Sequence, residues 1–186
     1  MEKDSEFIKN ENVPGPTKEE IRCLVVCKSK VSKNDDVVDI GCGTGGITVE
    51  MAKRAKNLIA IDKSPKAIET TLKNLKKFKL EDKVKLIEND ALNALKNINS
   101  IDIAIIGGSG NDLEEIIETI DKKINKNGRI IVTAILLETK VQAISKLKKL
   151  GYTTEFIEVN IAKGQNIQRG TIIFGQNPIA IITAVK

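Results

Sequence analysis

The sequence predicts an α/β fold with a mostly parallel, seven-stranded sheet and helices on both of its faces. Short apolar runs typical of strands alternate five times with segments of helical periodicity. Most of these strands are continuously apolar, as in parallel sheets that are buried on both sides. The last stretch has two β-rich runs with no helix between them, which predicts an antiparallel strand near the C-terminus. With 186 residues, we expect a single domain over residues 1–186.

The helices and strands follow from local signals. Thr17 and Glu20 have the spacing of a capping box, so a helix should begin there and end near Ser29. Ser64-Pro65 is a strong start signal, with Ser64 as N-cap of a helix that reaches residue 78. We expect further helices over residues 47–55, 113–124 and 138–150, and strands over residues 37–40, 58–61, 84–87, 101–106, 129–133, 153–161 and, in two runs, 171–185.

The segment Val37–Gly46 is the most informative part of the chain. A short apolar strand ends on a carboxylate and is followed at once by a glycine-rich turn and a helix. Glycine lacks a Cβ, so the turn can adopt left-handed backbone angles and approach a ligand closely. The following helix directs free N–H groups into the same space. We therefore expect a site for a nucleotide-like small molecule, bound by Gly41, Cys42, Gly43, Thr44 and Gly45.

Two ligand classes compete for this turn. Gly41, Gly43 and Gly46 match the G-x-G-x-x-G pattern of dinucleotide-binding proteins, and Asp62 lies near the offset of their ribose-binding acid. However, Asp39 directly precedes the glycines, where it would repel a pyrophosphate. The same carboxylate would attract the ammonium and sulfonium groups of S-adenosyl-L-methionine. The chain also lacks room for a separate dehydrogenase substrate domain, so adenosylmethionine is favoured.

The end of the third expected strand supports the same ligand. Asp90 can accept a hydrogen bond from the exocyclic amine of adenine, while the N–H of Ala91 meets a ring nitrogen. The alternative for Asp90 is a helix N-cap. For Asp62 this alternative is weaker, because Ser64 already caps the next helix.

Composition bounds the partners and the compartment. A net charge of +5 and a pI of about 9.0 favour an acidic partner, either nucleic acid or a polycarboxylate small molecule. Aromatic residues make up only 3% of the chain and are scattered, so we expect no base-stacking platform and no nucleic acid. Without histidine or a CxxC pair, no protein-bound metal is expected. The charged N-terminus and the lack of a long apolar run predict a cytoplasmic protein with reduced cysteines and no membrane contact.

Several longer segments carry a family resemblance. They are residues 15–20 (GPTKEE), 103–110 (IAIIGGSG) and 128–139 (GRIIVTAILLET), with shorter pieces at 160–164 and 169–171. Together with the glycine-rich turn, they resemble the CbiT-type cobalt-precorrin C15-methyltransferases (decarboxylating) of cobalamin biosynthesis, which have the Rossmann-like fold of class I SAM-dependent methyltransferases. The resemblance covers nearly the whole chain.

The resemblance implies a reaction, a cofactor site and an assembly. The reaction is methylation of carbon 15 of cobalt-precorrin-6B, with decarboxylation of the acetate on carbon 12, to give cobalt-precorrin-7. Residues 1–30 would pack on the cofactor site, and the protein would be a homo-oligomer, a tetramer. Contacts with adenosylmethionine would come from Thr17, the loop from Gly41 to Gly45, Asp62 and Ala91.

The residues fit this chemistry without a catalytic acid or base. The chain lacks histidine, the commonest general base, but an electron-rich tetrapyrrole carbon is itself the nucleophile. The task of the protein would be to align the reactants. Gly107, Gly108 and Gly110 would form a floor free of side chains at the end of the fourth strand. Candidates for binding the carboxylates of the tetrapyrrole substrate are Arg169, Lys163 and Lys140, for which surface or subunit contacts are the alternative.

Two other functions compete. An RNA or protein methyltransferase could share the fold, but base-amino methyltransferases usually carry an Asn/Asp-Pro-Pro-aromatic segment where this chain has Gly107–Gly110. A non-catalytic subunit that binds adenosylmethionine is the second rival, which the intact glycine-rich turn disfavours. Residues 164–176 could form either a lid or a subunit interface.

Overall fold

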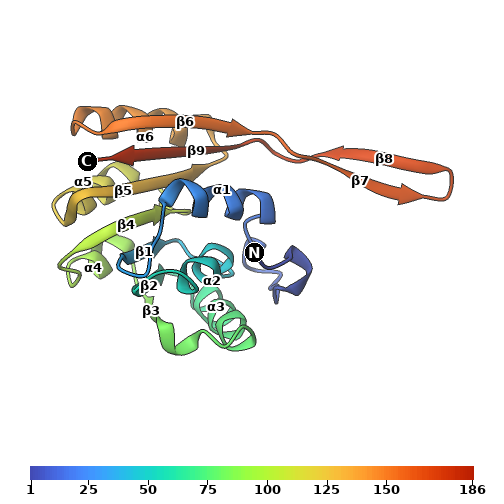
Figure 1. Ribbon diagram of the computed structural model, residues 1–186, viewed down its shortest axis with the longest axis horizontal. Helices are drawn as coiled ribbons and strands as arrows, with labels where there is room; N and C mark the ends of the chain where they lie inside the picture. Colours follow the sequence, from blue (N-terminus) through green and yellow to red (C-terminus); the bar gives the residue numbers. More distant parts are fainter.

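A seven-stranded sheet with the order β3-β2-β1-β4-β5-β9-β6 organises the computed structural model, which describes residues 1–186 (Figure 1). Strands β1 to β5 are parallel, and β9 is antiparallel to both of its neighbours, β5 and β6. The predicted fold class, including the reversed strand near the C-terminus, is confirmed. The strands of the sheet are β1 (Asp36–Ile40), β2 (Asn57–Asp62), β3 (Val84–Glu88), β4 (Ile101–Ile106), β5 (Ile124–Ala134), β6 (Thr153–Val159) and β9 (Ile179–Val185).

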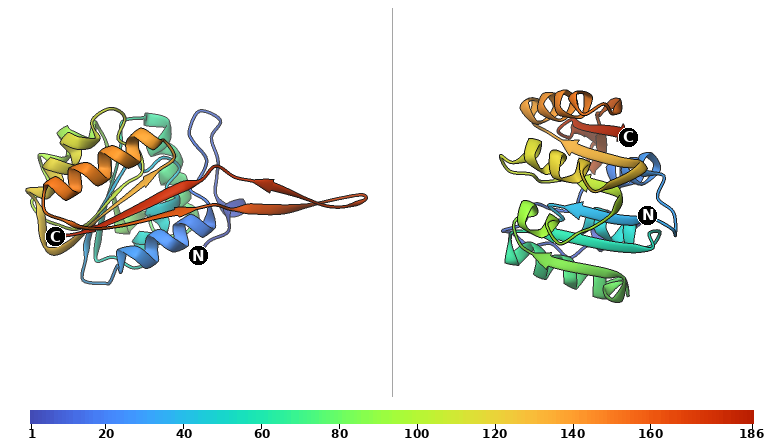
Figure 2. Two further views of the ribbon diagram at one scale, coloured as in Figure 1. Left: turned by 90° about the horizontal axis from the view of Figure 1, so that it is seen from above. Right: turned by 90° about the vertical axis from the view of Figure 1, so that its left-hand side faces the viewer.

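Helices cover both faces of the sheet and enclose two apolar cores, one on each side. Residues of α1, α2 and α3 contribute to one core, and residues of α4, α5 and α6 contribute to the other. Figure 2 shows α1 and α6 on opposite sides of the strands. The α-helices are α1 (Glu19–Ser29), α2 (Gly46–Ala52), α3 (Pro65–Lys77), α4 (Ala91–Leu95), α5 (Leu113–Asp121) and α6 (Leu137–Lys149), and the 3-10 helices are η1 (Asp4–Glu6) and η2 (Glu81–Lys83).

A two-stranded hairpin of β7 (Ala162–Ile167) and β8 (Gly170–Gly175) projects from the body of the molecule (Figure 1). Its strands pair with each other and not with the sheet. We call this hairpin, residues 162–175, the arm. The sequence predicts β8 as a β-rich run but not its partner β7, whose residues are nearly all polar or small.

Several predicted boundaries are confirmed. The fourth strand spans Ile101–Ile106 as expected, and Ser64 caps α3 by accepting a hydrogen bond from the N–H of Ala67 at 3.4 Å. The helix α4 was not expected as an element. It is only five residues long, too short for helical periodicity to be visible.

Two local predictions are wrong. The N-cap of α1 is Lys18 and makes no side-chain capping bond, so Thr17 does not form the predicted capping box. The reason is that the carbonyl of Thr17 accepts a hydrogen bond from the buried guanidinium of Arg22, which holds Thr17 outside the helix.

The boundary between α5 and β5 is the second correction. The helix ends at Asp121, and Ile124, predicted as its last apolar position, is the first residue of β5. Ile124 is buried in either arrangement, which is why its spacing was misleading. The register then shifts between Ile101 and Ile103, and Asn127 adopts a left-handed φ of 66° at this irregularity.

The strand order reverses at β1, which pairs with β2 on one side and β4 on the other. In open parallel sheets, ligands bind beyond the carboxyl ends of the strands at such a switch point. The topology therefore brings the turn after β1 to the centre of the edge where a ligand is expected.

Candidate functional site

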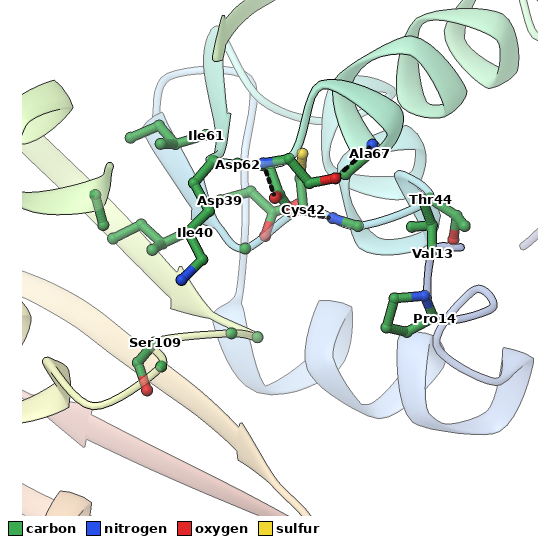
Figure 3. A pocket seen from close by; sticks show the side chains of 18 of the residues that line it. Val13, Pro14, Asp39, Ile40, Cys42, Thr44, Ile61, Asp62, Ala67 and Ser109 are labelled. Carbon is green, nitrogen blue, oxygen red and sulfur yellow. Dashed lines mark hydrogen bonds between the residues drawn. The ribbon is translucent and has the colours of Figure 1, made fainter. Parts of the chain in front are cut away.

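A cavity of about 370 Å³ opens at the carboxyl ends of β1 to β4 (Figure 3). Each strand contributes the loop that follows it, and residues 12–17 of the N-terminal segment form a further wall. We call residues 12–17 the strap. The predicted cofactor-binding residues that line the cavity are Thr17, Gly41, Cys42, Gly43, Thr44, Asp62, Asp90 and Ala91.

The turn after β1 owes its shape to glycines with left-handed angles. Gly41, Gly43 and Gly45 have φ values of 73°, 58° and 81°. The N–H groups of Gly41 and Cys42 both donate to the carbonyl of Ile61, at 2.8 and 3.1 Å, which fixes the turn to the end of β2. Gly45 is the N-cap of α2 and does not line the cavity. A Cβ at Gly45 would lie 2.9 Å from Thr71 Cγ2, so its role is to let α2 approach α3.

The loops after β1 and β4 make a close backbone contact. The N–H groups of Gly107 and Gly108 point at the carbonyl of Ile40, at 2.9 and 3.3 Å. A Cβ at Gly41 would lie 2.6 Å from the backbone atoms of Gly108. Gly107, Gly108 and Gly110 all line the cavity, so the predicted floor without side chains lies beside the glycine-rich turn.

Asp39 provides a buried negative charge below the turn. Its side chain is almost fully enclosed, and one carboxylate oxygen accepts a hydrogen bond of 2.6 Å from Thr48 Oγ1. Burial raises the pKa of Asp39 to about 6; the bond from Thr48 opposes this shift, and the nearby charge of Asp62 adds to it. A cationic ligand group in the cavity would supply the missing countercharge.

Asp62 is held by two backbone groups. Its Oδ2 accepts a hydrogen bond from the N–H of Gly43 at 3.0 Å, and its Oδ1 accepts one from the N–H of Ser64 at 2.9 Å. The carboxylate is therefore fixed in place between the glycine-rich turn and the start of α3, at the edge of the cavity. Both oxygens keep a lone pair for a ligand hydroxyl.

Asp90 combines both roles considered for it from the sequence. It lines the cavity, and its Oδ1 accepts hydrogen bonds from the N–H groups of Leu92 and Asn93 at 2.9 and 3.4 Å. It is thus the N-cap of α4, and this cap orients the carboxylate at the end of β3. The contact of Asp90 with adenine stays a prediction.

Cys42 is buried, and its Sγ lies 3.7 Å from Thr71 Oγ1. Burial raises the pKa of the Cys42 thiol, with a further contribution from the charge of Asp39. A protonated, buried thiol is a poor nucleophile, so Cys42 contributes packing and its backbone rather than reactivity.

The structure does not bring the three predicted carboxylate-binding residues to the cavity. Lys140 pairs with Glu158 at 2.5 Å, and Lys163 pairs with Glu20 at 2.6 Å. Arg169 lies in the turn between β7 and β8, at the tip of the arm. None of the three lines the cavity: Lys140 lies on α6, where it faces Glu158 of β6, and Lys163 and Arg169 lie on the arm, which projects beyond the body of the molecule.

Sequence reasoning named no lining residue of the strap except Thr17, although the family resemblance implies that residues 1–30 pack on the cofactor site. Asn12, Val13 and Pro14 line the cavity, yet this stretch has no periodicity or motif that would have revealed them. It also missed Lys63, whose Nζ reaches to 4.0 Å from the position of a Cβ on Gly110. The only available signal for Lys63 was its place directly after Asp62 at the end of β2.

The structure contains neither a cluster of potential metal ligands nor a helix that could span a membrane. No group of three or more Cys, Asp or Glu side chains is arranged to hold a metal ion, and the chain contains no histidine. None of the helices has the length and apolar character needed to span a bilayer.

Comparison with known proteins places these features in a family. The model of a family described as a precorrin methyltransferase domain matches residues 12–186. A relative from Methanobrevibacter smithii, named a probable cobalt-precorrin-6B C15-methyltransferase (decarboxylating), is 56% identical over the full length of both chains. A crystal structure from Methanobacterium thermoautotrophicum, described as precorrin-8W decarboxylase, is 51% identical with a TM-score of 0.97 and covers 99% of each chain.

A more distant structure has the same architecture. The precorrin-6Y C5,15-methyltransferase of Geobacter metallireducens is 31% identical with a TM-score of 0.92, over 100% of this chain and 98% of that one. The likeness therefore includes the strap, the sheet and the arm.

Proposed function

This chain belongs to the precorrin methyltransferase family, and from that membership we propose that it methylates carbon 15 of cobalt-precorrin-6B and decarboxylates the acetate on carbon 12, giving cobalt-precorrin-7. The relatives named for this reaction align over the whole chain. The observation that carries the proposal is the acidic cavity built from a left-handed glycine turn over the buried carboxylate of Asp39. Such a cavity suits a cationic methyl donor better than a phosphorylated one.

Adenosylmethionine, when bound, supplies an electrophilic methyl group on a positively charged sulfur. The residues of the cavity fit this molecule: Asp39 offers a countercharge, Asp62 offers acceptors for ribose hydroxyls, and Asp90 with Ala91 can meet an adenine edge. The strap residue Thr17 would close the other wall. Unlike a dinucleotide, adenosylmethionine has no phosphate group that these three carboxylates would repel.

The chain itself would act by alignment. Carbon 15 of the tetrapyrrole would be the nucleophile that takes the methyl group, and it would give up its proton. The ring would accept the electron pair left when the carboxylate departs as carbon dioxide, and uptake of a proton would turn the remaining CH2 into a methyl group. No histidine is available as a base, and the backbone floor of Gly107 and Gly108 leaves space for the reacting carbon beside the cofactor site. Holding the two reactants in one geometry can lower the barrier substantially without acid or base catalysis.

The direct test is incubation of the protein with adenosylmethionine and cobalt-precorrin-6B under anaerobic conditions, followed by mass spectrometry of the tetrapyrrole. We expect the product to gain one methyl group and to lose one carboxyl group, with one S-adenosylhomocysteine formed per turnover. An unchanged tetrapyrrole, in a preparation that calorimetry shows to bind adenosylmethionine, would contradict the proposed reaction.

Cofactor affinity should depend on the ionisation of Asp39. Burial raises its pKa from 3.8 to about 6, so this group makes the ligand-free fold less stable as the pH rises between these values. A cationic ligand favours the ionised form, so we expect the affinity for adenosylmethionine to rise with pH through about 6 and to level off above it. Calorimetry between pH 5 and 8 measures the slope. Asp39→Asn keeps the hydrogen bond to Thr48 without titrating, so its affinity should be weaker at pH 8 and should lose this slope.

Asp62→Ala should weaken adenosylmethionine binding by roughly 1–3 kcal/mol, because it removes acceptors for the ribose and the bond to Gly43. The matched control is Asp112→Ala, which also removes a carboxylate from the cavity lining but lies after β4. Calorimetry at constant pH compares the two. Equal losses for both variants would mean that Asp62 acts only through the overall charge of the cavity.

We also propose that the protein is a homo-oligomer, a tetramer, held together through its arms. An isolated two-stranded hairpin is only marginally stable in water, yet the arm exposes Ile172, Ile173 and Phe174. Packing of arms from several copies would cover these side chains. Sedimentation of the protein and of the Ile173→Ser/Phe174→Ser variant tests this assembly, and a monomeric wild-type protein would contradict it.

The unpaired, exposed thiols of Cys23 and Cys27 are typical of a reducing compartment, so we place the protein in the cytoplasm. We further propose that it requires neither a protein-bound metal nor a nucleic acid. This follows from the lack of histidine and from the scattered aromatic residues. Salt-sensitive binding of RNA would contradict the second part.

A further inference from the structure

Four apolar side chains stand exposed at the start of α6. Ile135, Leu136, Leu137 and Val141 are 56%, 64%, 67% and 55% exposed, and they belong to neither core. We call these four residues the apolar ledge. Three of them, Ile135 to Leu137, lie in the segment 128–139 that carries the family resemblance, and none of the four lines the cavity. Contiguous apolar patches on the surface of a soluble protein often mark a site where a ligand or a partner binds.

The apolar ledge continues the glycine floor of the cavity. In the parallel pair of β4 and β5, Ile106 lies opposite Val132. Two residues after this pair, the chain reaches Gly108 on one side and Ala134 on the other. The next residue after Ala134 is Ile135, the first residue of the ledge. Neighbouring strands are about 4.8 Å apart, so the ledge begins beside the floor. The contact of the loops agrees, since a Cβ on Gly107 would lie 3.8 Å from Thr133 Oγ1.

Charges divide the cavity into two sides. The carboxylates of Asp39, Asp62 and Asp90 follow β1, β2 and β3, on the side assigned to the cofactor. On the side of the loop after β4, the cavity lining includes Asp112 but also three glycines, and the amine of Lys63 reaches this side from the end of β2. Lys63 makes no salt bridge within the chain, although its Nζ lies beside Gly110. The second side thus offers an apolar surface with a free cation at its edge.

We propose that the apolar ledge binds one face of the tetrapyrrole macrocycle and that Lys63 binds one of its peripheral carboxylates. The inference rests on the proposed function and assigns the substrate side of that same site. A precorrin macrocycle presents apolar ring atoms and methyl groups on its faces and carboxylates on its rim, so its face suits the ledge and its rim suits the lysine. Bound in this way, the ring edge would lie over the glycine floor, next to the cofactor side.

A binding measurement tests this without requiring turnover. Uroporphyrin, a planar tetrapyrrole with carboxylates on its rim, is titrated into the protein, and the shift of its main absorption band is recorded. We expect Leu136→Ser/Leu137→Ser to weaken binding about tenfold or more, and Lys63→Gln to weaken it several-fold. Both leucines are exposed and Leu136 is the N-cap position of α6, where serine is well tolerated, so the variant should fold.

The matched control is Ile173→Ser/Phe174→Ser, which removes two exposed apolar side chains from the arm instead. This control is expected to lose the proposed tetramer, but each protomer keeps its own ledge, so it should still bind uroporphyrin as the wild type does. The ledge variant should keep its affinity for adenosylmethionine. Unchanged uroporphyrin binding by the ledge variant, or no binding by the wild type, would overturn the proposal. Loss of the oligomer in the ledge variant would assign the ledge to a second copy and would also overturn it. If the wild type binds uroporphyrin but does not convert cobalt-precorrin-6B, the proposed reaction fails while the ledge stands.

Discussion

Gly41→Ala is expected to destabilise the ligand-free protein by roughly 2–4 kcal/mol and to abolish measurable binding of adenosylmethionine. Two costs add at this position. The backbone has a φ of 73°, which disfavours any residue with a Cβ, and the added methyl group would lie 2.6 Å from the backbone of Gly108. Backbone atoms cannot move aside as a flexible side chain can, so the loops after β1 and β4 would have to separate.

Two other alanine substitutions isolate these costs. Gly43→Ala shares the left-handed strain, with a φ of 58°, but its methyl group would meet no atom within 4 Å. It should cost only about 1 kcal/mol of stability, and its main effect should be on ligand binding, because Gly43 lines the cavity. Gly108→Ala places the methyl group on the other partner of the Gly41–Gly108 contact. There it would lie 3.6 Å from Gly41 Cα, which is a normal van der Waals distance.

Thermal and denaturant unfolding of the three ligand-free variants provide the measurement. The expected order of stability is Gly108→Ala, then Gly43→Ala, then Gly41→Ala as the least stable. If Gly41→Ala and Gly43→Ala have the same free energy of unfolding, the contact with Gly108 does not contribute to the loss of stability, which then comes from backbone strain alone.

The central part of the fold could be predicted because its signals are local. The strand Ile101–Ile106 is an apolar run interrupted only by Asp102, and Ser64-Pro65 marks a helix start whatever lies around it. The ends of these strands are then fixed by topology, since parallel strands place their carboxyl ends at one edge. This is why residues far apart in sequence, such as Gly41, Asp62 and Gly107, could be assigned to one site and do line one cavity.

The remaining errors arise where a residue's role depends on distant contacts. Ile124 fits the apolar stripe of α5 and the buried start of β5 equally well, so spacing alone could not decide between them. Lys163 and Arg169 lie in segments of strong family resemblance. Their distance from the cavity follows from an arm that leaves the sheet, which no local pattern reveals.

The strap is the clearest case, because buried polar side chains hold its segment in place. Asn74, on α3, accepts a hydrogen bond from the N–H of Ile8 at 2.7 Å and donates to the carbonyls of Ile8 and Thr44, at 3.0 and 2.8 Å. The Asn74 amide, 66 residues from Ile8 in the sequence, thereby joins the N-terminal segment to the glycine-rich turn. A sequence reading sees only a polar residue within a helix.

Arg22→Met is expected to release the strap and to weaken adenosylmethionine binding at least tenfold. The Arg22 side chain is fully buried, and its guanidinium lies 4.7 Å from the centroid of the Phe7 ring. It donates hydrogen bonds to Asp4 at 2.7 Å and to the carbonyls of Glu2 and Thr17. Methionine fills much of the volume but leaves these three acceptors without their donor, which should cost about 2–4 kcal/mol of unfolding free energy.

The control is Arg54→Met, since Arg54 also bonds to a buried residue, Glu50, but is one-third exposed and forms no hydrogen bond with the strap. It should change the stability by less than about 1 kcal/mol and leave cofactor affinity intact. Limited trypsin digestion gives a second measure, because release of the strap would let the backbone at the exposed Lys9 and Lys18, on either side of it, adapt to the protease. Faster cleavage at these lysines together with weaker binding identifies Arg22 as the anchor of this wall. An Arg22→Met protein that loses stability but keeps its cofactor affinity would show instead that the cavity does not need the strap in place.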